Sequence, residues 1–260
     1  MIYAVLLDSQ TGWNLPLLIG LACIAAIYIK LTLNRKIHHK FPLLFFLGLL
    51  LLYMTIGSPL ATMSHLSFST HMIQMSILYF IIPPILILGI PLAFFQTKNI
   101  IRVSLMPTIA LFIFAFLFFM YHMPVMLHVL SQSQLLHNGY LLLLFVLSFG
   151  MWWPLAAPNL QASIFDNNRR RNRFAHLSGL VIMPACLVFI VSAFFGGMEN
   201  PFMTHAAAEL CLPPHIDAMD IVPPIFNSKL DQLLAGIAML GLHKLGIFMT
   251  LHIGKIVNDE

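Results

Sequence analysis

Residues 69–90 read STHMIQMSILYFIIPPILILGI, and they determine what kind of fold this chain adopts. A mostly apolar run of about twenty residues is what a helix needs to cross the hydrocarbon core of a bilayer. The rest of the chain has the same character. Of all residues 60% are hydrophobic and 8% are charged, and the mean hydropathy is +0.91. This composition excludes a soluble globular domain.

Further apolar runs of similar length flank this one on both sides. They predict an all-α, polytopic membrane helix bundle of about seven transmembrane helices, formed by one integral membrane domain over residues 1–260. The first ten residues lack the positive start and the cleavage site of a signal peptide, so we expect the first span to act as the insertion signal. The predicted spans are 13–31, 41–58, 69–90, 101–121, 135–153, 177–196 and 231–253.

The basic residues predict the orientation of the bundle, because cytoplasmic loops carry an excess of Lys and Arg. Nearly all of them fall in alternate loops, whereas Lys229 lies on the other side and Lys244 lies inside the last span. This pattern places the N-terminus outside and the C-terminus in the cytoplasm. The net charge of +4 is therefore an orientation signal and indicates no nucleic-acid partner. The loop residues on the cytoplasmic side are Lys30, Arg35, Lys36, Lys40, Lys98, Arg102, Arg169, Arg170, Arg171, Arg173 and Lys255.

Three proline-containing segments carry structural expectations. Pro83-Pro84 should kink or break the third span. The stop formed by Trp152, Trp153 and Pro154 is most simply an aromatic belt anchor at the membrane interface. The loop at about 197–230, which contains two Pro-Pro pairs, is expected to be an ordered cap or a partner surface.

Twelve histidines and sixteen methionines in so apolar a chain suggest a metal site. Thioethers and imidazoles are ligands that monovalent copper prefers. The strongest local pattern is His71-Met72-x-x-Met75, because residues three and four apart share one face of a helix. The alternative is that both methionines fill apolar space and that His71 forms a hydrogen bond at the interface.

The seventh span repeats this combination. Gln232, Gly236, Met239 and His243 form one narrow stripe at helical spacing, and Gly236 allows close approach of a backbone or a ligand. His243 would lie near the middle of the bilayer, where it is either a functional residue or a hydrogen-bonding residue between helices. Asp231, at the outer entrance, is either the N-cap of this helix or a group that attracts a cation.

The other histidines divide by side. His122 and His137 end the fourth span and open the fifth, at the level of His71, so several spans contribute imidazoles to one side. His65, His128, His205 and His215 also fall at or near the outer face, whereas His38, His39, His176 and His252 lie in or beside basic inner segments. The three cysteines form no disulfide framework and no Cys-x-x-Cys motif. Phosphate-loop and His-Glu-x-x-His motifs are also missing.

Five ordered segments over about 58–240 make the chain resemble the Bacillus-type CtaG family of cytochrome c oxidase assembly factors. They include the third-span motif that follows Ser58-Pro59 and contains His71, Met72 and Gln74. The others are Pro83-Pro84 with Gly89-x-Pro91, Tyr121-His122-Met123-Pro124, His137 followed by Trp152-Trp153-Pro154, and Asp231-Gln232-x-x-Ala235-Gly236-x-x-Met239. One departure is Met75, where members of the family often carry a histidine.

The resemblance implies a multi-pass protein of the bacterial plasma membrane that helps to assemble a haem–copper oxidase by handling copper. It also implies that His71, Met72, His122, His137, Asp231 and Met239 take part. We therefore expect a non-enzymatic factor that binds Cu(I) at an outer His/Met site, to which we add Met75 and His243, and passes it to an oxidase subunit. A copper donor protein and membrane lipid are further expected partners. The alternatives are a copper permease and a metal-free chaperone for an oxidase subunit.

Overall fold

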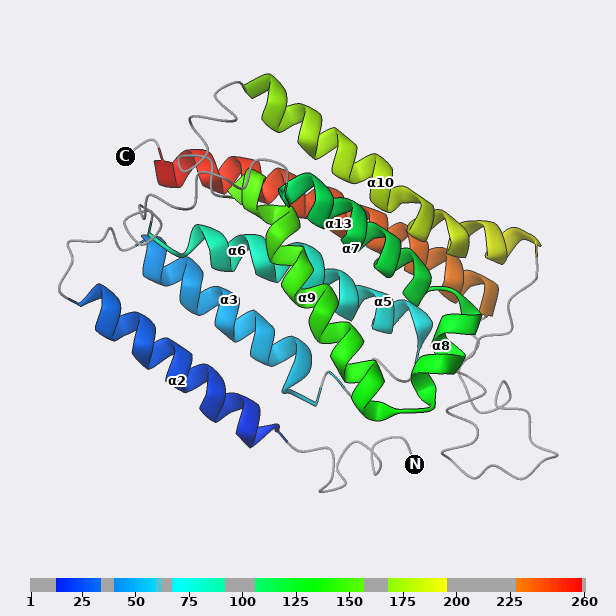
Figure 1. Cartoon of the computed structure of the whole chain (residues 1–260), viewed down its shortest axis with the longest axis horizontal. Helices are drawn as coiled ribbons and strands as arrows, with labels where there is room; N and C mark the ends of the chain where they lie inside the picture. The colour runs from blue at the N-terminus through cyan, green and yellow to red at the C-terminus, as the bar shows by residue number, and fades with distance from the viewer. Residues whose placement is uncertain are drawn as a thin grey trace.

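The computed structural model of the chain is a bundle of helices joined by loops (Figure 1). It describes residues 13–33, 40–59, 61, 67–91, 106–156, 168–195 and 228–258. No strand occurs in these residues, which confirms the predicted all-α fold. The helices are α2 (Leu15–Thr32), α3 (Lys40–Ile56), α5 (Phe68–Ser76), the π-helix η1 (Ile77–Ile81), α6 (Ile82–Leu88), α7 (Met106–Tyr121), α8 (Pro124–Ser131), α9 (Gln134–Ala156), α10 (Asn168–Phe195) and α13 (Ser228–Asn258).

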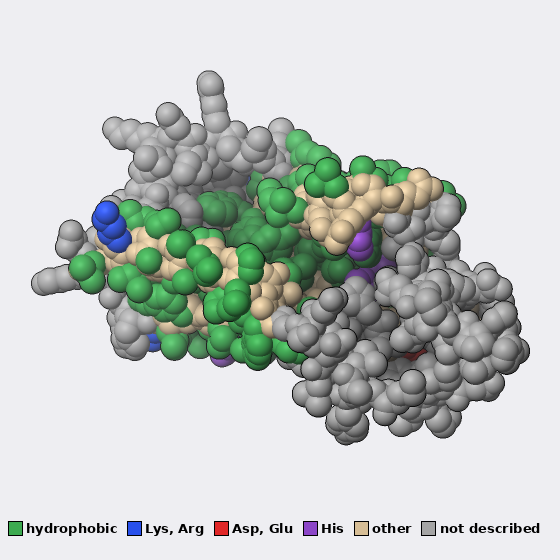
Figure 2. Space-filling view, turned by 90° about the horizontal axis from the view of Figure 1, so that it is seen from below, with side chains coloured by type: hydrophobic (Ala, Val, Ile, Leu, Met, Phe, Trp, Pro, Cys, Tyr) green, Lys and Arg blue, Asp and Glu red, His purple; other side chains and the backbone are tan. Residues whose placement is uncertain are grey.

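The longest helical segments have the length and the apolar composition of membrane spans. Large hydrophobic side chains such as Ile19, Phe116 and Phe248 are exposed on their outer faces. On the face that Figure 2 shows, hydrophobic side chains make up much of the described surface, and few charged ones appear among them. By length and composition, 5 described segments can cross a membrane: Leu15–Thr32, Phe68–Leu88, Gln134–Ala156, Arg169–Phe195 and Lys229–Ile256. Two shorter apolar helices, Lys40–Ile56 and Pro107–Tyr121, overlap the two remaining predicted spans.

Two hydrogen bonds fix the two ends of the bundle. The amide of Asn14 donates to the carbonyl of Gly57 (2.9 Å), which pairs the start of α2 with the end of α3. The hydroxyl of Tyr28 donates to the carbonyl of Gly89 (2.8 Å), which pairs the end of α2 with the end of α6. We call the first the α8 end, because α8 lies there, and the second the basic end (Figure 1). The basic end holds the helix termini that carry Lys30, Lys40, Arg169, Arg170, Arg171, Arg173 and Lys255.

The largest difference from the predicted boundaries is in α10, which begins at Asn168 rather than at 177. Its first turns are rich in arginine, so a search for apolar runs detects only the later part of the helix. Arg169 and Arg170 are exposed there. The predicted loop 197–230 falls mostly outside the described residues, and residues 228–230 form the first turn of α13. The predicted outer residues His65, His205 and His215, and the predicted inner residues His38 and His39, also lie outside the described residues.

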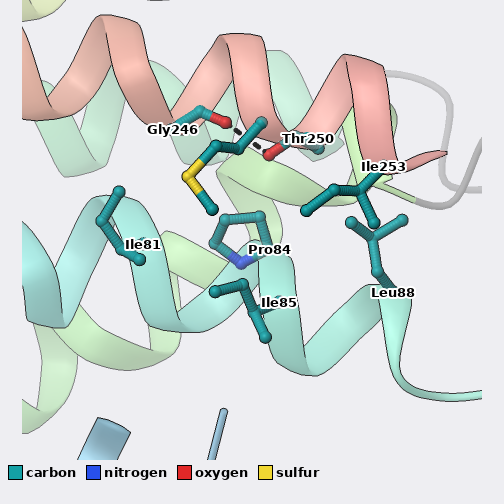
Figure 3. Close-up of a pocket in the computed structure, with 8 residues that line it drawn as sticks. Ile81, Pro84, Ile85, Leu88, Gly246, Thr250 and Ile253 are labelled. Carbon is teal, nitrogen blue, oxygen red and sulfur yellow. Dashed lines mark hydrogen bonds between the residues drawn. The ribbon is translucent and has the colours of Figure 1, made fainter. Parts of the chain in front are cut away.

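The segment α5–η1–α6 forms the centre of the bundle, and α13 runs beside it in the same direction. The carboxylate of Asp231 binds the first residues of α5, and Gly246 lies against the carbonyl of Phe80 in η1. Further along, Thr250 and Ile253 face Ile85 and Leu88 of α6 around a small pocket (Figure 3). Each level of α13 therefore corresponds to a level of the third span, from Asp231 beside Phe68 to Ile253 beside Leu88.

The pair Pro83-Pro84 widens the third span instead of breaking it. Both prolines lie inside α6, and the turn before them is the π-helix η1, in which the amide of Ile82 donates to the carbonyl of Ile77. A π-turn of this kind is one of the adjustments that accommodate groups left unbonded when proline removes an N–H. Of the expected kink or break, the break is wrong, because the segment is continuous from Phe68 to Leu88.

Trp152 completes this adjustment, and its predicted role as a belt anchor is wrong. Its side chain is 1% exposed, and its indole Nε1 donates to the carbonyl of Tyr79 (2.9 Å). In an α-helix this carbonyl would accept from residue 83, which is a proline. The interfacial interpretation failed because the tryptophan meets its hydrogen-bonding requirement inside the protein rather than at the lipid headgroups.

The contact of Gly246 with η1 predicts a selective effect of adding one methyl group. A Cβ at Gly246 would clash with the carbonyl oxygen of Phe80, whereas a Cβ at Gly241 on the same helix meets nothing within 4 Å. We expect Gly246→Ala to lower the free energy of unfolding by about 1–3 kcal/mol, as overpacking does. Gly241→Ala should leave it unchanged or raise it by up to about 1 kcal/mol. Unfolding of the two variants by SDS in mixed micelles tests this, and equal effects would contradict it.

Candidate functional site

Histidines from different helices gather around Tyr121 at the α8 end. Nε2 of His71, in the second turn of α5, lies 3.3 Å from the hydroxyl of Tyr121, the last residue of α7. Nε2 of His137, at the start of α9, lies 3.2 Å from the same hydroxyl. His71 and Tyr121 are buried and His137 is half-buried. One phenol thus joins two imidazoles that are far apart in the sequence.

The chemistry of the phenol makes these two bonds different. A phenol has one proton to donate, so Tyr121 donates to one Nε2 and accepts an N–H from the other. When both imidazoles are neutral, they therefore carry their protons on different nitrogen atoms. In one of the two rings, His71 or His137, Nε2 therefore carries a lone pair. This lone pair accepts the hydrogen bond from the hydroxyl of Tyr121.

His122 follows Tyr121 directly and has a different environment. Its Nδ1 is bonded to the carbonyl of Phe118, and because a carbonyl accepts, Nδ1 carries the proton. In the neutral ring, Nε2 is then left with its lone pair. This atom is buried and has no hydrogen-bond partner. The ring packs edge to face on Phe118 and Phe189, with centroid distances of 4.6 and 5.0 Å.

Metal-binding histidines in proteins commonly have the same arrangement as His122. An N–H bonded to a backbone carbonyl fixes the tautomer and aims the other nitrogen. Leaving that nitrogen buried without a partner costs free energy, on the order of 1–3 kcal/mol. A ligand that accepts the lone pair would remove this cost.

Thioethers lie in the same part of the core. The side chains of Met72, Met75 and Met239 are 1%, 5% and 0% exposed, so none of them faces lipid. Met72 and Met75 both follow His71 on α5. Met239 lies on α13 between the residues that contact Phe68 and Phe80, which places it at about the depth of Met75.

Asp231 is bound to protein groups. It lies within α13 rather than at its N-cap, and it caps a different helix. Its Oδ1 accepts from the hydroxyl of Ser67 (2.7 Å) and the amide of Ser69 (3.0 Å), and its Oδ2 accepts from the amide of Phe68 (2.8 Å). The prediction that it caps its own helix is therefore wrong. The carboxylate satisfies amides at the start of α5, the helix that carries His71.

Two glutamines beside the predicted site residues also have structural partners. The side-chain amide of Gln74 donates to the carbonyl of Thr55 in α3 (2.7 Å). The side-chain oxygen of Gln232 accepts from the hydroxyl of Ser192 in α10 (3.2 Å). Gly236 of the same stripe lies against the carbonyl of Cys186, which confirms its predicted role in close approach. The polar groups of these stripes thus connect helices.

The structure separates the predicted metal residues into groups. It brings His71, His122 and His137 together around Tyr121, whose ring centroid lies 6.4, 5.5 and 6.1 Å from theirs. His243 instead lies deeper, beside Phe80, with ring centroids 4.9 Å apart. In the described part of the chain, no three His, Cys, Asp or Glu side chains are close enough to hold one metal ion. A shared ion would therefore need thioether ligands.

The remaining histidines agree with the simpler expectations. His176 and His252 are exposed and lie towards the basic end of α10 and α13. His128 lies in α8, at the opposite end. The residue missed by the sequence analysis is Tyr121. A tyrosine directly before His122, at the end of an apolar run, was the available signal.

Removal of the hydroxyl of Tyr121 should have two opposite effects. In Tyr121→Phe, Nε2 of His71 and of His137 both lose this bond, so we expect the stability to fall by about 1–2 kcal/mol. The same loss removes a competitor for the lone pair, so the affinity for Cu(I) should rise several-fold. Competition with a chromophoric Cu(I) chelator and SDS unfolding measure the two effects. Tyr140→Phe, which removes a bond to the carbonyl of Leu117 (2.7 Å), is the matched control and should leave the copper affinity unchanged.

The fold and this cluster define a class: a helical protein of membrane type with buried imidazoles and thioethers at one end of the bundle. The particular family follows from comparison with known proteins. A family model described as cytochrome c oxidase caa3 assembly factor matches residues 26–253, and the chain belongs to this family. The resemblance found in the sequence is thereby confirmed. Comparisons with curated proteins and with solved structures gave no match.

Proposed function

We propose that this chain is a multi-pass protein of the bacterial plasma membrane that binds copper on the outer side and hands it to an oxidase subunit. The family makes it an assembly factor for cytochrome c oxidase. The copper-binding role, the seven crossings and the orientation are our proposal. In this role the chain binds and transfers an ion without making or breaking covalent bonds, so it acts without being an enzyme.

The distribution of charge supports the orientation. Basic side chains gather at the basic end, which the rule for cytoplasmic loops assigns to the inside. The α8 end, with the cluster around Tyr121, would then face the outside of the cell. Figure 2 shows histidine atoms at the described surface, among hydrophobic side chains. Copper arriving from outside, or from a donor protein, would meet the half-buried His137 first.

One observation carries the copper proposal: the buried Nε2 of His122, which has a fixed tautomer and no hydrogen-bond partner. Nearby on α5 lie an imidazole and two thioethers, and Cu(I) accepts a small number of such soft or borderline ligands. Asp231 is left out of the ligand set because its oxygens already accept bonds from α5. We assign the outer site to His122 and one of His71 and His137, with Met72 and Met75 as the thioether ligands that a shared ion needs.

The same ligands explain how the ion could be released. Neutral imidazole and thioether groups bind Cu(I) less firmly than thiolates do, so a partner with better ligands can remove it by exchange. Tyr121 would assist, because its hydroxyl can take back the bond to His71 or His137 as the ion leaves. The proposed recipient is a copper site of an oxidase subunit.

The proposal is tested in cells that lack the chain and are complemented with variants. Wild type should restore the copper content of the purified oxidase, whereas His122→Phe should leave it copper-poor at equal protein abundance. His176→Phe, at an exposed position, should act as wild type. A change in whole-cell copper with normal oxidase copper would indicate a permease instead. A fully copper-loaded oxidase with the His122 variant would favour the metal-free chaperone.

A further inference from the structure

His243 is a buried imidazole that the outer cluster does not use. Its side chain is 1% exposed, and neither ring nitrogen has a hydrogen-bond partner. It lies three turns beyond Asp231 along α13, between Phe80 of η1 and Trp152 of α9. The ring centroids are 4.9 and 6.0 Å from those of Phe80 and Trp152. The neighbouring Lys244 is exposed and points away from this interior.

In a neutral imidazole at this position, the nitrogen that carries the lone pair has no hydrogen-bond donor beside it. The ring meets Phe80 at 70°, so an edge N–H can point at an aromatic face, which is a weak interaction. The other nitrogen holds a lone pair, for which an aromatic face is no partner. A buried acceptor without a donor costs on the order of 1–3 kcal/mol. A simple packing role would be filled better by an apolar side chain.

A soft ligand lies one turn away on the same helix. Met239 precedes His243 by four residues, so the two side chains share a face, with their Cβ atoms about 5–6 Å apart. The side chain of Met239 is 0% exposed. The order of the two residue types is the reverse of that on α5, where His71 precedes Met75 by four residues. An imidazole lone pair and a thioether at this spacing, in an apolar enclosure, suit a monovalent soft cation of low coordination number.

We propose that Met239 and His243 form a second Cu(I) site, deeper in the bundle than the cluster around Tyr121. This inference rests on the proposed function and deepens it, because it gives the chain two positions for the same ion. The first position would exchange copper with partners. The second would hold copper in reserve, screened from water by Phe80 and Trp152.

The packing beyond His243 favours a closed position over a permeation route. The next pocket along the contact between α6 and α13 is lined by apolar side chains such as Ile81, Pro84 and Met249 (Figure 3). Its volume of about 10 Å³ leaves room for about one water molecule. The hydroxyl of Thr250 there donates to the carbonyl of Gly246 (2.6 Å). An ion at His243 would therefore return towards the α8 end.

The test counts Cu(I) bound to the full chain in detergent, by competition with bicinchoninate. We expect about two ions per wild-type chain, and about one each for His243→Phe, Met239→Leu and His122→Phe. His252→Phe is the matched control, because His252 is exposed on the same helix and should retain both ions. SDS unfolding of each variant shows whether the chain remains folded. X-ray absorption at the copper edge of the His122 variant should detect a sulfur neighbour, and the double variant with Met239→Leu should bind no copper.

The outcomes separate this inference from the proposed function. One ion in wild type, lost in His122→Phe and kept in His243→Phe, overturns the deeper site and leaves the proposed function intact. One ion lost in His243→Phe alone supports the deeper site and contradicts the outer one. Wild type without bound Cu(I) contradicts both. Should His243→Phe be too unstable to measure, Met239→Leu decides, because it replaces the thioether with an apolar group of similar volume.

Discussion

Replacing His122 with phenylalanine should lower the affinity of the outer site for Cu(I) at least tenfold. Loss of a group that only orients a ligand already costs about 10- to 100-fold, and His122 is assigned as a ligand. The variant should also be as stable as wild type or more stable. It loses a hydrogen bond to the carbonyl of Phe118, but it removes a buried nitrogen that has no partner. Chelator competition gives the affinity, and SDS unfolding gives the stability.

His122→Gln sharpens this prediction. A glutamine keeps a polar side chain at the position but offers no imidazole nitrogen to a soft ion, so its copper affinity should fall as in the phenylalanine variant. His176→Phe serves as the control, since His176 is exposed on α10. An unchanged affinity in both His122 variants would show that the lone pair of Nε2 is not used, and the outer site would have to be rebuilt on other residues.

Removal of the Asp231 carboxylate should have the largest effect on stability. Asp231→Ala takes away the acceptor of three hydrogen bonds at the start of α5, two of them from backbone amides. Hydrogen bonds to a charged group contribute about 1.5–3 kcal/mol each, but they share one carboxylate and are not additive. We therefore expect the free energy of unfolding to fall by about 3 kcal/mol. SDS unfolding in mixed micelles measures it.

Graded substitutions separate capping from metal binding at this position. Asp231→Asn keeps one acceptor oxygen and should lose about half as much stability. Leu234→Ala, on the exposed face of the same helix, should change stability by less than about 1 kcal/mol. The Cu(I) count per folded chain should stay the same in Asp231→Asn. A stable Asp231→Asn variant that fails to bind copper would instead identify the carboxylate as a ligand.

Local periodicity was enough to predict the helices and the end of the bundle where the imidazoles gather. Apolar runs mark membrane helices directly, because the bilayer sets their length. The alternation of basic loops then assigns each helix end to a side. This is why His71, His122 and His137 were expected at one level, and the structure joins all three through Tyr121.

The contacts that distinguish one residue from another required the structure. Asp231 and Phe68 are 163 positions apart in the sequence, so nothing local indicates that one caps the helix of the other. Trp152 was misinterpreted for the same reason. Its partner is the carbonyl of Tyr79 on another helix, which receives no amide hydrogen bond from residue 83 because that residue is a proline. His243 packs between Phe80 and Trp152, and no local pattern indicates this aromatic enclosure, which separates His243 from the outer cluster.

The most direct test of the account is the transfer of copper between purified proteins. The chain is loaded with Cu(I) in detergent, mixed with copper-depleted cytochrome c oxidase subunits and separated from them, and copper is then measured in both fractions. We predict that the loaded chain binds copper and that most of it moves to the oxidase fraction, whereas His122→Phe delivers little. A chain that binds no Cu(I), or one that keeps all of it in the presence of the oxidase subunits, would contradict the account.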